Sequence, residues 1–352
     1  MKVEKKVISH LNKCYAMSEL TYNGRHCFLV AAEKHDPCYL FAEDGALLET
    51  VWEEPGGVMT MTPVPGGNGA FLATHKFYSP NDSKEAKIVI ATPQGEGKWE
   101  IRTLVEAPFV HRFGILSRNG VNYLIVCCLK SGHEYKNDWR FPGACYGAVL
   151  PDDLSSYNEG HQLELTVLKD KMLRNHGYSL CPQDGYDTAI VGCEEGTFQF
   201  IPPAAPGGAW EIRQLCAVPS SDSVLLDFDG DGKPELGCIS PFHGASLTIY
   251  HLDEDGNYVP QWKYPAPEAD TDMIHATWAG ELLGKPTWCV GWRKGTKDTI
   301  AITWDGKTYA TEYIDRDTGC ANLMHFVNAQ GQDVLVGTNR EIDEVAMYTV
   351  TD

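Results

Sequence analysis

Three stretches of this 352-residue sequence share one pattern: His111–Cys128 reads HRFGILSRNGVNYLIVCC, His176–Cys193 reads HGYSLCPQDGYDTAIVGC, and His275–Trp292 reads HATWAGELLGKPTWCVGW. In each, a histidine begins an apolar strand, a turn glycine follows nine residues later, and a second strand of small and branched residues comes after the turn. The turn glycines are Gly120, Gly185 and Gly284. A unit of this kind that recurs with a period of about 40 to 50 residues predicts a β-propeller.

Weaker copies of the unit extend the pattern over the whole chain. They begin near Tyr15, Thr60 and Val224 and at His325, which gives seven units. The N-terminal stretch VEKKVISHL is a strand without a unit, and pairing it beside the last unit would close the ring and remove the exposed sheet edges. We therefore expect an all-β fold: residues 1–352 form a single seven-bladed β-propeller domain with four-stranded blades. The length also permits an alternative, two β-sandwich domains of about 170 residues each.

Composition restricts the class of protein. Hydrophobic residues make up 43% of the chain, yet no run approaches the roughly 18 apolar residues of a membrane helix, and the N-terminus lacks the apolar segment of a secretion signal. The twelve cysteines, several of them in apolar runs, indicate buried free thiols in a reducing compartment. We expect a cytoplasmic protein without a membrane partner.

Net charge argues against one class of partner. Asp and Glu number 48 against 29 Lys and Arg, which gives a formal charge of −19. A chain this acidic repels phosphate backbones, so no nucleic-acid partner is expected. A cytoplasmic protein that acts on a small molecule fits this composition.

One acidic turn carries a metal-binding pattern. In DFDGDGKPE, carboxylates occupy positions 1, 3, 5 and 9, and Gly232 lies where the chain must bend. Oxygen ligands at this spacing suit Ca²⁺, although the Glu at position 12 of an EF-hand is missing and strands flank the turn. The alternative is an acidic hairpin that binds no metal.

Residues Leu226–Leu236 resemble the FG-GAP or VCBS repeat of integrin-α-like propellers, whose DxDxDGxxD/E loop binds Ca²⁺ in a blade hairpin. The resemblance covers one unit of the seven. It implies four Ca²⁺ ligands: Asp227, Asp229, Asp231 and Glu235. The other turns lack the acidic pattern.

Histidines are expected to gather at one mouth of the propeller channel. Four begin an inner strand, where side chains converge on the axis: His111, His176, His275 and His325. Four more follow the second strand of their units and should rim the same mouth: His35, His75, His133 and His243. Neutral imidazoles in a cluster can hold Zn²⁺ or Mn²⁺, and imidazole can also act as a general acid or base. For any single histidine, a hydrogen-bonded structural role remains the alternative.

Cations and aromatic residues map to the same mouth. Among the cations expected there are Arg112, Arg174, Arg293 and Arg340. Because Arg binds carboxylates through two parallel hydrogen bonds, we expect an anionic small molecule or oligosaccharide as substrate. Trp292 could stack on a sugar ring, and Tyr178 could serve as a base.

Together these features favour a metal-assisted carbohydrate-active enzyme, a lyase that acts on a uronate-containing sugar. The expected catalytic residues are His111, His133, His176, His275, His325, Tyr178 and Arg293, and the expected substrate-binding residues are His35, His75, His243, Arg112, Arg174, Arg340 and Trp292. The architecture is similar to that of seven-bladed sugar lyases, without a shared motif. The alternative is a non-catalytic propeller that binds a glycan or a protein partner through the same face.

Overall fold

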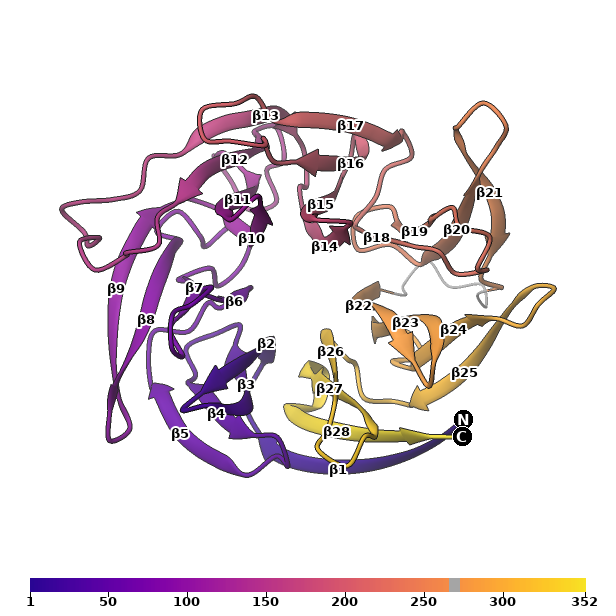
Figure 1. The fold of residues 1–352 in the computed structure, drawn as a ribbon, viewed down its shortest axis with the longest axis horizontal. Helices are drawn as coiled ribbons and strands as arrows, with labels where there is room; N and C mark the ends of the chain where they lie inside the picture. Colours follow the sequence, from indigo (N-terminus) through magenta and orange to yellow (C-terminus); the bar gives the residue numbers. More distant parts are fainter. Residues whose placement is uncertain (266–272) are drawn as a thin grey trace.

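Antiparallel strands form nearly all the regular structure of the chain. The computed structural model describes residues 1–265 and 273–352, and its sheets stand around a ring (Figure 1). Within those two ranges the only helical element is the short 3-10 helix η1 (Arg340–Ile342). The prediction of an all-β propeller built from four-stranded sheets is confirmed.

The sheets divide into seven four-stranded groups within the described residues. Five sheets contain four strands each, and one contains eight. The eight-stranded sheet consists of two runs, β10–β13 and β14–β17, which a single residue pair, Arg118 and Tyr186, joins. We number the groups as blades in chain order from β2 onward and describe the two runs separately.

Blade 1 contains β2 (Cys14–Tyr22), β3 (Arg25–Ala32), β4 (Cys38–Ala42) and β5 (Leu47–Trp52). Blade 2 contains β6 (Met61–Pro63), β7 (Phe71–His75), β8 (Lys87–Gly95) and β9 (Lys98–Glu106). Blade 3 contains β10 (Val110–Arg118), β11 (Val121–Lys130), β12 (Pro142–Leu150) and β13 (Thr166–Met172). Blade 4 contains β14 (Gly177–Gln183), β15 (Tyr186–Cys193), β16 (Gly196–Ile201) and β17 (Glu211–Cys216).

Blade 5 contains β18 (Asp222–Leu226), β19 (Glu235–Ser240), β20 (Ser246–Leu252) and β21 (Tyr258–Lys263). Blade 6 contains β22 (Met273–Leu282), β23 (Lys285–Lys294), β24 (Thr299–Trp304) and β25 (Tyr309–Asp315). Blade 7 contains β26 (Asn322–Val327), β27 (Asp333–Asn339), β28 (Glu344–Thr351) and β1 (Lys2–His10).

The N-terminal strand closes the ring, as predicted. Strand β1 pairs with β28 in antiparallel register from Lys2 opposite Thr351 to His10 opposite Glu344. The two chain ends therefore lie side by side at the outer edge of blade 7 (Figure 1). Pairing the last sheet with the first segment satisfies an edge that would otherwise expose unpaired backbone groups.

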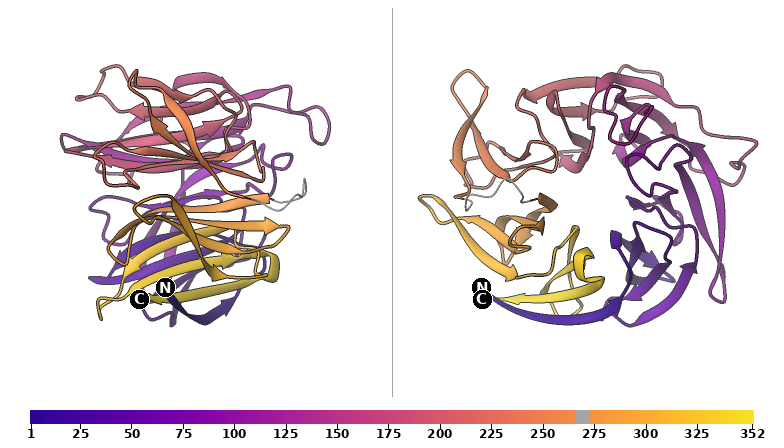
Figure 2. Two further views of the ribbon diagram at one scale, coloured as in Figure 1. Left: turned by 90° about the vertical axis from the view of Figure 1, so that its right-hand side faces the viewer. Right: turned by 180° about the vertical axis from the view of Figure 1, so that it is seen from behind.

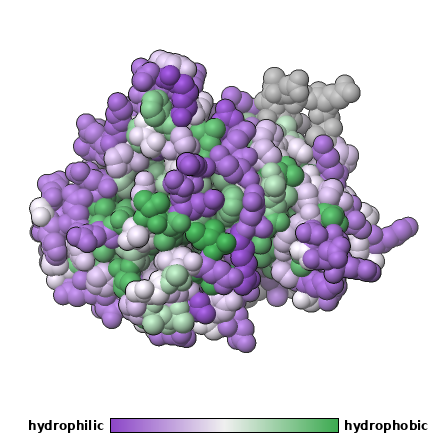
Figure 3. All heavy atoms as spheres, turned by 90° about the horizontal axis from the view of Figure 1, so that it is seen from above, coloured by the Kyte–Doolittle hydropathy of each residue, from purple (hydrophilic) through white to green (hydrophobic). Residues whose placement is uncertain are grey.

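The core lies between neighbouring blades. Second strands such as β3 and β11 are buried along most of their length, whereas the outer strand β13 is largely exposed. The ring is a thick disc when it is seen edge-on (Figure 2). On the side of blades 3 and 4, hydrophilic residues separate the hydrophobic surface into patches (Figure 3).

All twelve cysteines are buried free thiols, as their positions in apolar runs predict. Among the described residues, no helix has both the length and the apolar character to cross a bilayer.

Candidate metal centre

A ring of polar residues surrounds the axis where the inner strands begin. Each member lies nine residues before a glycine with positive φ in the turn that follows the inner strand. In chain order, the members are Tyr15, Thr60, His111, His176, Ser221, His275 and Asn322. The corresponding glycines are Gly24, Gly69, Gly120, Gly185, Gly230, Gly284 and Gly331. The same local spacing therefore brings residues of all seven blades to one level of the channel.

β-bulges aim three of these side chains inward. The register of the first strand pair shifts at Tyr15 in blade 1, at His111 in blade 3 and at His275 in blade 6. A bulge inserts one extra residue, bends the strand and redirects a side chain. All three residues are buried, so their polar atoms must find partners within the protein.

His176 is held by an acidic partner. Its Nδ1 lies 2.9 Å from an Oδ atom of Asp222 and 3.3 Å from the hydroxyl oxygen of Ser221, and the Ser221 hydroxyl donates to the same carboxylate oxygen. A carboxylate accepts but cannot donate when it is ionised, so this pair places a proton on Nδ1 of His176. Nε2 of His176 then presents a lone pair to the channel, the arrangement that carboxylate–histidine pairs give metal ligands.

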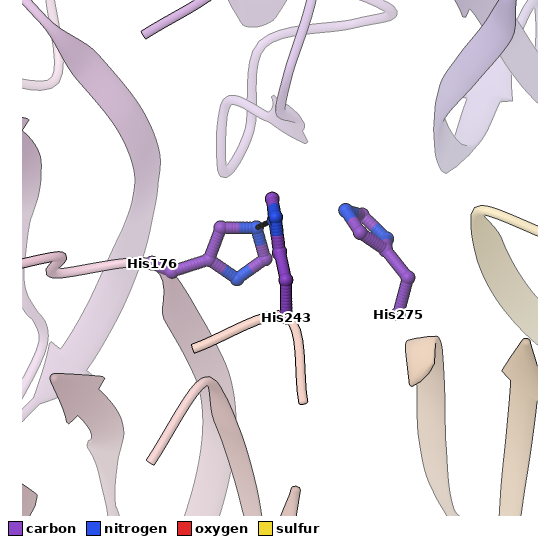
Figure 4. Close-up of side chains that lie close together, drawn as sticks. All are labelled: His176, His243 and His275. Atoms are coloured by element: carbon purple, nitrogen blue, oxygen red, sulfur yellow. Dashed lines mark hydrogen bonds between the residues drawn. The ribbon is translucent and has the colours of Figure 1, made fainter. Parts of the chain in front are cut away.

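His243 reaches the cluster from a loop. It lies between β19 and β20 with φ of 51°, and the ring of Phe242 stacks on its imidazole at a centroid distance of 3.9 Å. This stacking turns Nε2 of His243 toward Nε2 of His176 at 3.2 Å (Figure 4). Two ring nitrogens thus face each other across the mouth.

His275 completes a group of three. Its Nδ1 lies 2.7 Å from the carbonyl oxygen of Ala321, which can only accept, so the proton is on Nδ1 and Nε2 carries a lone pair. One ring nitrogen from each of His176, His243 and His275 lies within 4.8 Å of the other two. Figure 4 shows the three rings around a common space.

His111 and Tyr15 form a second layer beside this group. Nδ1 of His111 donates to the carbonyl oxygen of His176 at 3.2 Å, and the two rings lie 4.3 Å apart. The Tyr15 hydroxyl lies 3.1 Å from Nε2 of His275 and 3.5 Å from Nε2 of His111. One hydroxyl proton therefore faces two nitrogen lone pairs.

Burial keeps most of the cluster neutral. The pKa values of His111, His243 and His275 all lie well below 6.5, chiefly because burial disfavours the charged ring and secondarily because the neighbouring imidazoles and arginines make a further positive charge unfavourable. Burial raises the pKa of Asp222, but attraction by His176 and Arg112 outweighs it, and the net shift is downward. At neutral pH each of these neutral imidazoles keeps one unprotonated ring nitrogen, which metal binding requires.

Arg112 is the cation that lies beside Tyr15 and His111. Its guanidinium lies over the ring of Tyr15 at 5.5 Å and donates to the carbonyl oxygen of Met59 and to the side-chain oxygen of Asn322 at 3.1 Å. Among the described residues, it forms no ion pair with a carboxylate. It attracts Asp222 at longer range, but within the same residues it has no carboxylate in direct contact.

The other predicted arginines are already paired. Arg174 contacts Glu194 at 3.1 Å and lies over the rings of Trp139 and Phe242. Arg293 contacts Glu341 at 2.9 Å, and Arg340 bridges the same Glu341 and Glu33. These pairs neutralise much of the positive charge that the sequence places at the mouth.

Four of the eight predicted histidines, His111, His176, His243 and His275, contact one another, and the other four have different packing partners. His35 packs on Tyr78, His75 on Trp52 and His133 on Phe109. His325 contacts Asp333 at 2.7 Å and packs on Trp278. In blade 7 the position equivalent to His275 is Asn322, because Asn322 precedes its turn glycine by nine residues and His325 precedes it by six. Functional roles for the outlying histidines stay predictions.

The two predicted aromatic site residues lie in the packing between strands. Tyr178 of β14 packs against Gly114 of β10, where a Cβ atom would collide with its hydroxyl oxygen. Trp292 is buried against Tyr264. Neither is among the residues that contact the histidine group.

The predicted calcium loop gathers its carboxylates. Oxygen atoms of Asp227, Asp229, Asp231 and Glu235 lie within 4.8 Å of one another. Asp227 accepts hydrogen bonds from the backbone amides of Gly230 and Gly232, and the buried Glu235 accepts one from Phe228 at 2.6 Å. Burial raises the pKa of Glu235 to about 7. His251, which lies outside the sequence motif, adds a ring nitrogen 3.6 Å from Asp229.

Sequence reasoning missed part of the inner ring. Tyr15, Thr60, Ser221 and Asn322 are not histidines, so a search for imidazoles passes over them. The signal that finds them is the nine-residue spacing to the turn glycine, which applies to all seven units. Asp222 could then be found as the carboxylate that follows Ser221.

Solved structures with the same fold span nearly the whole chain. Virginiamycin B lyase from Staphylococcus aureus matches with a TM-score of 0.59 and 13% identity over 99% of both chains. The Cps50 (Swd1) β-propeller domain of Myceliophteria thermophila matches with a TM-score of 0.64 and 9% identity over 99% of this chain and 100% of that one. The periplasmic gluconolactonase PpgL of Pseudomonas aeruginosa matches with a TM-score of 0.59 and 11% identity over 96% and 92%. At such identities the likeness establishes the propeller fold alone.

No family model matches the chain, and no curated protein matches its sequence. The resemblance of Leu226–Leu236 to an FG-GAP or VCBS repeat therefore has no support beyond the loop itself.

Proposed function

We propose that the protein is a metal-dependent enzyme whose active centre is the histidine group of the channel mouth. His176, His243 and His275 would hold the metal, and Zn²⁺ or Mn²⁺ fits three imidazole nitrogens. The observation that supports this most strongly is the 3.2 Å separation of the Nε2 atoms of His176 and His243. Two nitrogen ligands of a tetrahedral Zn²⁺ lie about 3.3 Å apart when each bond is about 2.05 Å. Three protein ligands also leave a fourth position for substrate.

The proposed substrate is an anionic sugar that carries a uronate carboxylate. Arg112 supports this choice because its charge has no carboxylate partner among the described residues. Trp139 and Phe242, whose rings lie 5.4 Å apart, offer apolar surface beside His243 on which a sugar ring can stack. Solved structures with the same fold include a virginiamycin B lyase and a gluconolactonase.

The proposed reaction is a β-elimination. A bound metal would polarise the uronate carboxylate and so acidify the adjacent C–H bond. His111 is neutral at pH 7, and its Nε2 lone pair can accept that proton. The C–O bond to the leaving group then breaks and a C=C bond forms. The departing oxygen takes a proton from the Tyr15 hydroxyl. His111 then gives the proton that it took from the substrate to Tyr15, which restores the hydroxyl.

One observation favours a second candidate, a non-catalytic propeller that binds a glycan or a protein partner through the same face. His111, His176 and His275 are each at most 4% exposed, and closed metal sites are typical of structural roles. In that case the metal would stabilise the mouth without reacting with substrate.

Metal analysis of the native protein separates these candidates. We expect purified protein to contain about one equivalent of a transition metal, and His176→Ala and His275→Ala to lose it while they keep the β-sheet circular dichroism of the wild type. His10→Ala is the matched control because His10 is exposed on β1. Metal-dependent formation of an unsaturated uronate, followed by ultraviolet absorbance, would support the lyase. Metal without turnover would favour the binding protein, and equal metal content in all variants would contradict both.

A further inference from the structure

Blade 2 contains a hollow that shares no residue with the histidine group. Its volume is about 340 Å³, and its lining includes His75, Lys76, Lys87, Arg102 and Asn158. Strands β7, β8 and β9 supply most of this lining, and the loop between β12 and β13 contributes Asn158 and Glu159. A hollow of this size holds a small organic molecule.

His75 supplies a polar atom that lacks a partner. The residue is 3% exposed, and its Nε2 forms no hydrogen bond with any residue that the structure describes. Its ring packs on Trp52 at 4.6 Å, which fixes the imidazole at the end of β7. A buried polar atom without a partner is costly, so a ligand that bonds to it would gain free energy.

Three cations, Lys76, Lys87 and Arg102, line the hollow with this imidazole although the chain carries a net charge of −19. Lys87 lies opposite His75 in the β7–β8 pair and donates to Thr103 at 3.3 Å, and Arg102 donates to three carbonyl oxygens of the loop above it. Their fixed positions make a cationic wall that needs little rearrangement to receive an anion.

Exposed carboxylates now balance these cations. Lys76 pairs with Glu85 at 3.1 Å, Lys87 with Glu159 at 3.7 Å, and Arg102 with Glu100 at 3.3 Å. The side chains of Glu85 and Glu159 are each 80% exposed. Exposed ion pairs contribute about 0–1 kcal/mol, so an anionic ligand can displace them.

We propose that this hollow is a binding site for a phosphorylated small molecule, with the phosphate on Lys87 and Lys76 and one of its oxygens on Nε2 of His75. The volume leaves room for an organic part beyond the phosphate. Burial, followed by the charges of Lys87 and Lys76, lowers the pKa of His75 to about 3, so the imidazole binds as a neutral hydrogen-bond partner. The site goes beyond the proposed lyase activity and does not depend on it.

Calorimetric titration with inorganic phosphate and with glycerol 3-phosphate, at constant ionic strength in chloride, tests the proposal. We expect saturable binding of both, with the ester bound more tightly. Lys87→Met should weaken binding about tenfold, and His75→Phe about fivefold, because each removes one of the bonds to the phosphate. Glu159→Gln should strengthen it about twofold, because the competing carboxylate is lost.

Lys98→Met is the matched control, since Lys98 is an exposed lysine of the same β8–β9 hairpin that does not line the hollow. It should bind as the wild type does. Circular dichroism establishes whether each variant is folded. If Lys87→Met is not folded, His75→Phe alone tests the phosphate site. Absence of saturable binding by the wild type, or equal binding by the wild type, Lys87→Met and His75→Phe, would overturn the proposal.

Discussion

Tyr15 places one hydroxyl proton between two imidazole nitrogens that both carry lone pairs. The nearer is Nε2 of His275 at 3.1 Å, and the farther is Nε2 of His111 at 3.5 Å. A metal on His275 needs the lone pair that Tyr15 now occupies. Metal binding would therefore displace the Tyr15 hydroxyl from Nε2 of His275.

Replacing Tyr15 with Phe is expected to tighten metal binding. The variant removes the hydrogen bond that competes for His275, and a net hydrogen bond of about 0.5–1.5 kcal/mol corresponds to about a two- to tenfold gain in affinity. Zn²⁺ titration in competition with a chelator measures the change. Tyr178→Phe is the control, because no hydrogen bond joins Tyr178 to the histidine group in the described residues. Weaker binding by Tyr15→Phe would mean that the hydroxyl supports the metal instead.

His75 is expected to make folding stability depend on pH. Its pKa is about 3 in the folded protein and about 6.5 in the unfolded chain, so between these values the unfolded chain binds more protons. Stability then falls as the pH decreases below 6.5, by about 2 kcal/mol between pH 7 and pH 5 from this residue. Urea unfolding of the wild type and of His75→Phe in chloride buffers measures it. The variant should lose less stability, and parallel pH curves would refute the assignment.

The sequence predicts the position of some of the clustered histidines and not of others. His111, His176 and His275 could be placed because each precedes a turn glycine by nine residues. His325 follows a different spacing and lies outside the cluster, and His243 joins it only through a loop whose path depends on stacking against Phe242. Which loop histidines converge depends on tertiary packing, and local spacing carries no information about it.

At the scale of the element, local hydrogen bonds define the shape of the acidic hairpin between β18 and β19. Backbone amides of the loop donate to Asp227, Asp229 and Asp231, so the carboxylates are oriented by the turn itself. The spacing of the sequence motif predicted this gathering correctly because every contact is local. The contribution of His251 from β20 could not be predicted, since it depends on the register of a neighbouring strand.

Calcium is expected to raise the melting temperature through this hairpin. A ligand that binds only the folded state at about 100 times its Kd adds about 2.7 kcal/mol. Asp231→Asn should reduce the shift because it removes the charge of one exposed ligand without disturbing the core. Asp255→Asn, in the exposed turn between β20 and β21, is the matched control. Thermal unfolding with and without Ca²⁺ measures the effect, and equal shifts in both variants would place the ion elsewhere.

At the scale of the whole molecule, closure brings the inner-strand residues around one axis. The repeat predicted this because each unit buries its faces only against its neighbours, and a ring satisfies all of them. Residues 176, 243 and 275 come from blades 4, 5 and 6, so the candidate metal centre exists only while those blades stay in register. Stability of the ring and integrity of the site should therefore change together.

Removal of β1 tests that dependence. A chain that begins at Leu11 loses the pairing with β28, the ion pairs of Lys5 with Asp315 and Glu344, and the packing of Val3 and Ile8. Burial of those two side chains alone contributes about 2–4 kcal/mol to the free energy of unfolding, and the exposed edge of β28 can pair with another copy of the chain.

We expect a lower melting temperature, concentration-dependent dimers in size-exclusion chromatography, and weaker Zn²⁺ binding. A chain without Thr351 and Asp352 keeps most of the pairing and serves as control. Unchanged melting and metal affinity after removal of β1 would show that the other blades hold the mouth together without closure of the ring.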